Sequence, residues 1–179
     1  MDSETGDGPP RALLIAAIVV AVGALVAVLV VVVLRQPETR QQPVPIVAVP
    51  APQATGADCE ALSAALPDKL GDVPRAPVLD PAPPGAAAWR ADAESEAIIL
   101  RCGLDRPAEF VVGAPLQAVD EVQWFRMADA ASSTWYAVDR AVYVALTLPP
   151  DSGPTPIQQI SAAVAKALPA RPLDPAPVG

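Results

Sequence analysis

An uninterrupted apolar run near the N-terminus constrains this chain more than any other feature. Residues 12–34 are 23 consecutive residues without a polar side chain. As a helix the run would be roughly 34 Å long, slightly more than the ~30 Å hydrocarbon core of a bilayer. It shows no polar face, as a soluble surface helix would. We therefore expect a transmembrane signal anchor over residues 12–34; a cleaved signal peptide is the alternative, although its apolar region is ordinarily only about 7–15 residues.

Proline content divides the rest of the chain. The prolines concentrated in residues 35–57 favour an extended polyproline II stalk, and a second Pro-rich tail covers residues 169–179. Between them, residues 58–168 form a segment long enough for one hydrophobic core. The expected organisation is thus a short cytoplasmic tail (residues 1–11), the anchor, the stalk, one domain and a C-terminal tail.

Two amphipathic helices are predicted at the ends of this domain. The first has Thr55 or Asp58 as a possible N-cap and should end at Pro67. The second should begin with Thr155 as N-cap and Gln158 in a capping box. Both carry apolar residues at helical spacing, which favours burial of one face of each helix.

The segment between the helices reads as a short antiparallel meander. Residues 71–96 are Pro-rich and are predicted to be an irregular loop, whereas strands are predicted over residues 97–103, 122–128, 134–139 and 141–148, with a further short strand near 110–112. Close spacing favours antiparallel pairing. The predicted fold class is therefore α+β: an N-terminal transmembrane helix, then two amphipathic helices packed on one face of an antiparallel β-meander.

The register of one hairpin stays open at this level. A four-residue loop over 128–131 would place Trp124 opposite Trp135. A slip of two residues would place Arg126 beside Trp135 instead, with the same residues on each face.

The two cysteines indicate a disulfide. Cys59 falls on the apolar face of the first helix, and Cys102 alternates with the apolar residues of the first predicted strand. A bond between them indicates an oxidising compartment, so residues 35–179 are expected outside the cytoplasm on a single-pass plasma-membrane protein. Two buried free thiols are the alternative. Arginines flanking the apolar run are nearly balanced and do not decide the orientation.

Composition removes several function classes. The chain has no histidine, so neither a Ser-His or Cys-His nucleophile nor an imidazole metal ligand is available. Its net charge of -8 disfavours nucleic acid as a partner. We expect no catalytic residue, no cofactor and no metal. The alternative, an envelope enzyme using carboxylates or a bound metal, would rely on pairs such as Asp105 with Glu109 or Asp120 with Glu121.

A possible interaction surface is the remaining candidate site. Arg101, Asp139 and Arg140 are predicted to gather on the outer face of the sheet, where a carboxylate or phosphate of a partner could dock. Trp135 would join this surface if it proved exposed. An ordinary surface ion pair is the competing interpretation.

The segments CEALSAALPDKL, AAAWR, IILRCG, VQWFR, WYAVDRAVYVALTLP and PIQQISAAVAKAL resemble an actinobacterial family, domain of unknown function 3515, and especially its mycobacterial member. The resemblance covers residues 58–168 and the N-terminal run. It implies an alanine-rich membrane or secreted protein and no activity. An acidic stretch at residues 90–96 departs from the family pattern. The expected function is a cell-envelope interaction module, not an enzyme, with the membrane and an unidentified envelope protein or wall component as partners.

Overall fold

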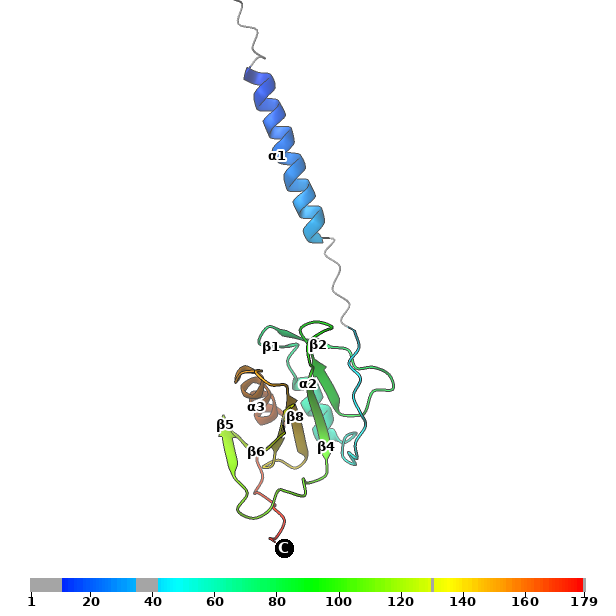
Figure 1. Cartoon of the computed structure of the whole chain (residues 1–179), viewed down its shortest axis with the longest axis vertical. Helices are drawn as coiled ribbons and strands as arrows, with labels where there is room; N and C mark the ends of the chain where they lie inside the picture. Colours follow the sequence, from blue (N-terminus) through cyan, green and yellow to red (C-terminus); the bar gives the residue numbers. More distant parts are fainter. Residues whose placement is uncertain (1–10, 35–41, 130, 179) are drawn as a thin grey trace, which may run out of the picture. The chain divides into compact units, whose positions relative to one another are not determined.

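The computed structural model describes residues 11–34, 42–129 and 131–178, and the chain divides into two compact units, residues 1–40 and 41–179. The first unit contains helix α1 (Arg11–Leu34) (Figure 1). Large apolar side chains of α1 between Ile15 and Leu29 are exposed. Residues 1–10 of the predicted tail and residues 35–41 of the predicted stalk lie outside the described residues.

The prediction of a transmembrane helix is wrong for the part of the chain that the structure describes, because no helix there is long and apolar enough to cross a membrane.

The second unit is α+β, as predicted, and is built around one antiparallel sheet (Figure 1). Its elements follow one another as α2 (Ala57–Ala65), β1 (Lys69–Leu70), β2 (Val73–Ala76), β3 (Ala86–Trp89), β4 (Ile98–Leu104), β5 (Leu116–Val119), β6 (Val122–Ala128), β7 (Ser133–Ala137), β8 (Tyr143–Leu148) and α3 (Thr155–Ala167). The strand order is β1-β2-β3-β4-β8-β7-β6-β5. Two four-stranded meanders therefore meet where β4 pairs with β8.

The sheet is larger than predicted, and the Pro-rich segment 71–96 contributes two of the additional strands, β2 and β3. Sequence reasoning missed them because Pro and Ala are depleted in strands. Pro74 is tolerated because it lies in β2, near the edge of the sheet. The alanines of β3 pack closely: Ala88 is fully buried, and Trp89 at the end of the strand is fully buried too.

Both helices of this unit bury their apolar faces against the same face of the sheet. Leu62 of α2 and Ile160 of α3 belong to one core cluster together with Leu100, Trp124 and Leu146 of the sheet. Each helix begins and ends close to its predicted limits, but neither has a side-chain cap: Gly56 and Pro154 occupy the N-cap positions. The predicted capping box at Thr155 is therefore wrong, because Thr155 is already inside the helix.

The predicted disulfide is confirmed. Cys59 and Cys102 are bonded, and each is only 1% exposed. The bond ties α2 to β4 and closes a loop that contains β1, β2 and β3.

The register of the β6–β7 hairpin is the slipped alternative. Arg126 pairs with Trp135, and Trp124 pairs with Ala137. Pairing extends to Ala128 and Ser133, and the Asp129 carboxylate accepts the backbone N–H of Ser132 at 2.7 Å in the turn that follows.

The second face of the sheet is covered by chain segments instead of helices. Residues 42–54, predicted as stalk, run along it: Val44 is 3% exposed and forms a bridge with Val78, while the Gln53 N–H donates to Gly103 O. Elsewhere on this second face, the loop after β4 packs with the C-terminal tail, and Val111 forms a bridge with Ala176. The structure thus differs from the predicted stalk and tail, because both proline-rich segments find apolar surface to cover.

Candidate functional site

The four residues predicted to share a surface lie at three separate places. Arg101 lies in the middle of β4 and alternates with Leu100 and Cys102, so it faces away from the helices. Trp135 lies on the opposite, helix-facing side and packs against the main core. Asp139 and Arg140 lie in the connection between β7 and β8. The structure does not bring the four together.

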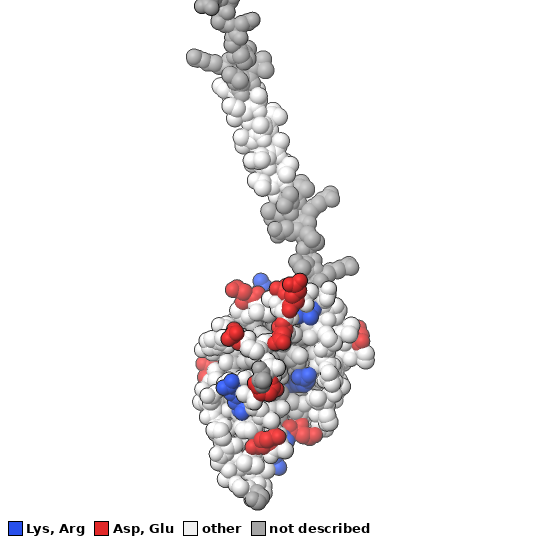
Figure 2. Space-filling view, viewed as in Figure 1, with Lys and Arg blue, Asp and Glu red and all other residues white. Residues whose placement is uncertain are grey.

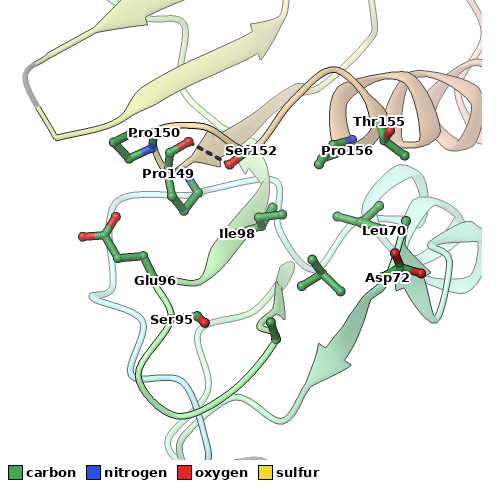
Figure 3. A pocket seen from close by; sticks show the side chains of 13 residues that line it. Leu70, Asp72, Ser95, Glu96, Ile98, Pro149, Pro150, Ser152, Thr155 and Pro156 are labelled. Carbon is green, nitrogen blue, oxygen red and sulfur yellow. Dashed lines mark hydrogen bonds between the residues drawn. The ribbon is translucent and has the colours of Figure 1, made fainter.

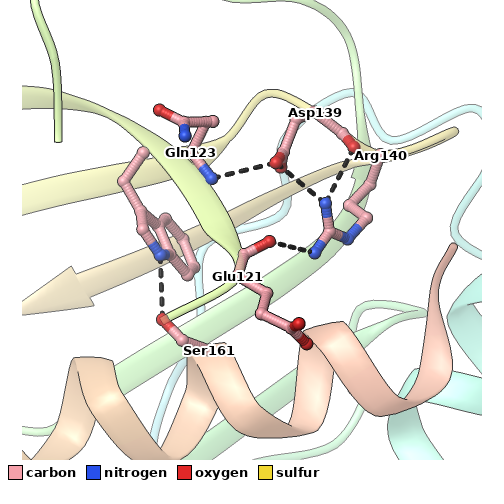
Figure 4. Close-up of polar contacts among 6 residues, drawn as sticks. Glu121, Gln123, Asp139, Arg140 and Ser161 are labelled. Atoms are coloured by element: carbon pink, nitrogen blue, oxygen red, sulfur yellow. Dashed lines mark hydrogen bonds and ion pairs between the residues drawn. The ribbon is translucent and has the colours of Figure 1, made fainter. Parts of the chain in front are cut away.

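Asp139 and Arg140 form a buried ion pair (Figure 4). Arg140 Nη1 lies 2.9 Å from Asp139 Oδ2, and its Nη2 donates to the backbone oxygen of Glu121 at 2.7 Å. The Gln123 N–H donates to the same Asp139 carboxylate at 3.0 Å. These bonds fasten the β7–β8 connection to the start of β6, so the pair holds the fold together and offers little surface to a partner.

The tryptophans are also engaged within the fold. Trp135 is half-buried, and the guanidinium of Arg126 lies 5.3 Å from the centre of its ring. The indole N–H of Trp124 donates to Ser161 Oγ of α3 at 2.9 Å (Figure 4), and that of Trp89 donates to Pro67 O at 3.0 Å. Trp89 and Trp124 are fully buried and Trp135 is half-buried, so the three tryptophans do not form an exposed aromatic surface.

Arg101 forms part of a cleft of about 410 Å³ on the face opposite the helices, which we call the Arg101 cleft. This size is within the range of small-molecule pockets. Segment 42–54 supplies one wall and the loop after β4 the other. The lining residues are Val49, Pro50, Arg101, Leu104, Asp105, Pro107, Thr134, Tyr136, Ala145 and Thr147.

Three neighbouring strands form the floor of the Arg101 cleft. Arg101 of β4 pairs with Ala145 of β8, which pairs in turn with Tyr136 of β7. The small side chain of Ala145 leaves a hollow between the guanidinium and the phenol. In the next row, the hydroxyls of Thr134 and Thr147 are hydrogen-bonded at 3.1 Å. The floor therefore combines a cation with three hydroxyl groups.

Arg101 has an unsatisfied donor in this cleft. Its Nε is buried and has no hydrogen-bond partner among the described residues. Burial lowers the pKa of Arg101, with the charge on Tyr136 opposing the change. An arginine nevertheless stays protonated in proteins. The charged guanidinium lines the cleft, so the cleft favours an anion that pairs with its terminal nitrogens.

The pKa of Tyr136 depends on burial and on the charges near the cleft. Burial raises the pKa of its phenol, the negative charge of Glu109 raises it further, and Arg101 lowers it. The phenol is therefore a neutral hydrogen-bond donor near pH 7. The predicted carboxylates Asp105 and Glu109 thus lie close to the cleft, the first as a lining residue and the second through its effect on Tyr136.

A larger cavity, of about 550 Å³, lies on the helix side between β1, the end of β8 and the start of α3 (Figure 3). Its wall is mostly apolar, with Leu70, Ile98 and Pro149 among the lining residues. Asp72 and Glu96 add acidic groups, and no lysine or arginine lines it. This cavity offers apolar surface without a positive group to orient an anion.

Few features of the described residues support the alternative of an enzyme that uses carboxylates or a bound metal. Asp120 adopts a left-handed conformation (φ 51°) in the turn between β5 and β6, next to Glu121. The carboxyl groups whose pKa is clearly shifted are those of Asp92 and Asp129, and hydrogen bonds lower both. A general acid would need a raised pKa. No group of three potential metal ligands is found among the described residues. On the face shown in Figure 2, acidic and basic side chains are interspersed.

Sequence reasoning identified Arg101 but missed its surroundings. Thr134 and Tyr136 of β7 are two residues apart, as are Ala145 and Thr147 of β8, so each pair shares one face of its strand. Which strands are neighbours, and hence which residues flank Arg101, was not visible. The contribution of Val49 was missed because residues 35–57 were taken as a stalk.

Comparison with known proteins places most of the chain in one family model. Residues 18–173 match the model described as protein of unknown function (DUF3515). No curated protein and no solved structure matches the chain.

Proposed function

The chain belongs to the family of unknown function DUF3515, and we propose that its folded unit is a binding module outside the cytoplasm that holds an anionic group of a cell-envelope partner in the Arg101 cleft. The protein is proposed to act by binding, not by catalysis. One observation carries the proposal: the guanidinium-bearing side chain of Arg101 lines the cleft, and no carboxylate among the described residues forms an ion pair with it.

Charge-assisted hydrogen bonds explain why an anion suits this position. A guanidinium donates two parallel N–H bonds to a carboxylate or phosphate, and such bonds are roughly twice as strong as neutral ones. Tyr136 and the Thr134–Thr147 pair add hydroxyl donors beside it. Arg106 lacks this enclosure, because it pairs with Asp174, whose side chain is 83% exposed.

The disulfide supports a location outside the cytoplasm. Disulfides persist in oxidising compartments and are rare where thioredoxin and glutathione keep thiols reduced. The Cys59–Cys102 bond lies in the core and connects two elements far apart in sequence. We expect it to be present in the cell.

Site-specific photo-crosslinking tests the binding role. A photoreactive residue replaces Val49, an exposed residue in the wall of the Arg101 cleft, in cells that naturally produce the protein. The matched control carries the same residue at Gln117, which is exposed on β5 on the helix-facing side. We expect a discrete crosslinked product from position 49 and none from position 117.

Crosslinking of charge-removing variants shows whether binding depends on the positive charge of Arg101. The same crosslinking is repeated with Arg101→Gln and with Arg171→Gln, which changes an exposed arginine that does not line the cleft. The product should disappear with Arg101→Gln and persist with Arg171→Gln. Equal amounts of product from both variants would rule out anion recognition at Arg101. The absence of any product while Arg101 is present would rule it out as well.

The location is tested separately. Cells are quenched in acid and denatured, because both cysteines are buried, and free thiols are then labelled with a mass-tagged maleimide. Labelling only after added reductant supports an oxidising compartment. Labelling without reductant would show reduced thiols in the cell and would exclude it.

A further inference from the structure

The charges around the Arg101 cleft select among anions. Arg101 is the one lysine or arginine that lines the cleft among the described residues, and Asp105 lines it as well. The charge of Glu109 acts on Tyr136 from nearby. A phosphate monoester carries about -1.5 to -2 at pH 7, whereas a carboxylate carries a single charge. With one cation and two neighbouring acids, the singly charged carboxylate meets less repulsion.

The threonine pair favours a neighbouring group that can both accept and donate. The Oγ1 atoms of Thr134 and Thr147 lie 3.1 Å apart, and their mutual bond uses one of the two O–H protons. One O–H remains to donate, and lone pairs remain to accept. A peptide amide has a C=O and an N–H and can satisfy both.

The spacing of these two features matches the end of a peptide. The Arg101–Ala145–Tyr136 row and the Thr147–Thr134 row are two residues apart along the strands, which is about 7 Å. One extended residue spans about 3.5 Å. A carboxylate beside Arg101 and an amide beside the threonines therefore fit within a terminal dipeptide. Val49, Pro50 and Leu104 offer apolar walls to its side chains.

We propose that the Arg101 cleft binds the C-terminal carboxylate of a peptide, with the preceding amides recognised by Thr134 and Thr147. The inference rests on the proposed function and names its ligand class. Arg101 pairs with the carboxylate through the terminal nitrogens of its guanidinium, and the neutral Tyr136 hydroxyl donates to the same carboxylate across Ala145.

Methyl NMR of the full-length, disulfide-bonded protein tests the ligand class with defined probes. The probes are N-acetyl-valyl-alanine, its C-terminal amide and phenyl phosphate. We expect the peptide acid to shift the methyl signals of Val49, Leu104 and Thr147 saturably. The exposed Val112 methyls, which do not line the cleft, serve as the internal control. The amide should bind at least tenfold more weakly than the acid, and phenyl phosphate should also bind more weakly.

Matched variants assign the contacts. Arg101→Gln should weaken binding of the peptide acid at least tenfold, and Arg171→Gln should leave it unchanged. If Arg101→Gln is misfolded by its methyl spectrum, Arg101→Lys keeps the charge, loses the planar fork and should still weaken binding several-fold. Thr147→Val keeps the shape of the side chain and should weaken binding several-fold, whereas Thr55→Val, at an exposed position outside the cleft, should not.

The outcomes separate this inference from the proposed function. Equal binding of acid and amide overturns it, as does unchanged binding by Thr147→Val. Tighter binding of phenyl phosphate that is lost in Arg101→Gln overturns the carboxylate while leaving anion recognition intact. Absence of any Arg101-dependent product in the crosslinking experiment overturns the proposed function itself.

Discussion

At the scale of single residues, Arg101 and Tyr136 interact across one small residue. They lie on either side of Ala145 in the same row of the sheet. Each changes the titration of the other: Arg101 lowers the pKa of Tyr136, against a larger increase caused by burial. An alanine between a cation and a phenol gives a hollow in which both can reach one ligand atom.

This coupling predicts a pH dependence. The ordinary pKa of a tyrosine is 10.0, and in the folded state the pKa of Tyr136 is raised. A raised folded-state pKa contributes stability that is complete below about pH 10 and is lost as pH rises through the folded value. We therefore expect the free energy of unfolding to fall above about pH 10. Burial raises the pKa of Tyr143 too, so it contributes in the same direction.

Ultraviolet titration of the tyrosines measures the effect directly, because the chain has two tyrosines. Tyr136→Phe leaves Tyr143 alone and assigns each titration. Arg101→Gln removes a positive charge and should move the Tyr136 titration to higher pH. A shift to lower pH in this variant would contradict the placement of Arg101 beside the phenol.

The two ion pairs found among the described residues should differ strongly in their contribution to the free energy of unfolding. The side chains of Asp139 and Arg140 are 10% and 2% exposed, whereas those of Asp174 and Arg106 are 83% and 37% exposed. Asp139→Asn leaves a buried guanidinium without its counter-charge and should lower the free energy of unfolding by about 3–5 kcal/mol.

Asp174→Asn is the matched control, since it makes the same chemical change in an exposed pair. It should cost less than about 1 kcal/mol. Urea denaturation of both variants measures the difference. Equal losses would show that burial of the Asp139–Arg140 pair does not govern its contribution.

At the scale of elements, a bulge in β4 allows segment 42–54 to lie against the sheet. The register with β8 shifts between Cys102 and Leu104, and Gly103 in the bulge has φ +84°. A Cβ at Gly103 would lie 2.3 Å from the backbone nitrogen of Ala54. The close approach places this segment, including Val49, at the edge of the Arg101 cleft.

Gly103→Ala should therefore destabilise the protein more than Gly113→Ala. Gly113 has nearly the same backbone angle, φ +85°, but nothing lies within 4 Å of an added Cβ. The backbone strain costs about 1–2 kcal/mol at both positions. The clash at Gly103 should add about 1–3 kcal/mol. Thermal and urea unfolding compare the two, and indistinguishable stabilities would show that segment 42–54 does not pack on the bulge in solution.

At the scale of the whole molecule, the Cys59–Cys102 bond joins the helical layer to the sheet. The cysteines are 43 residues apart in sequence. The loop they close contains the first meander up to β4. For a loop of this length, the chain-entropy model gives roughly 4 kcal/mol of stabilisation.

Reduction should consequently lower the free energy of unfolding by about 4 kcal/mol, a large share of the total for a small domain. Urea denaturation with and without reductant measures this loss. A Cys59→Ala/Cys102→Ala double variant should lose a similar amount and should not respond to reductant. An unchanged denaturation midpoint on reduction would contradict the tethering role.

The sequence by itself determined the features that depend on local periodicity. The bounds of β6, the burial of one face of each amphipathic helix and the burial of both cysteines all follow from the spacing of apolar residues. The α+β class follows from the order of these elements. The apolar run at residues 12–34 predicted a helix, but its predicted membrane crossing was not supported in the described chain.

Only the tertiary structure decided which elements are neighbours. β3 forms from alanines that have little strand preference, because pairing with β4 and burial under α2 and α3 outweigh local propensity. The β6–β7 register was open in the sequence, since a slip of two residues keeps every side chain on its own face. The Arg101 cleft unites three strands and segment 42–54, so its composition depends on contacts between residues far apart in the chain, and local spacing carries no information about them.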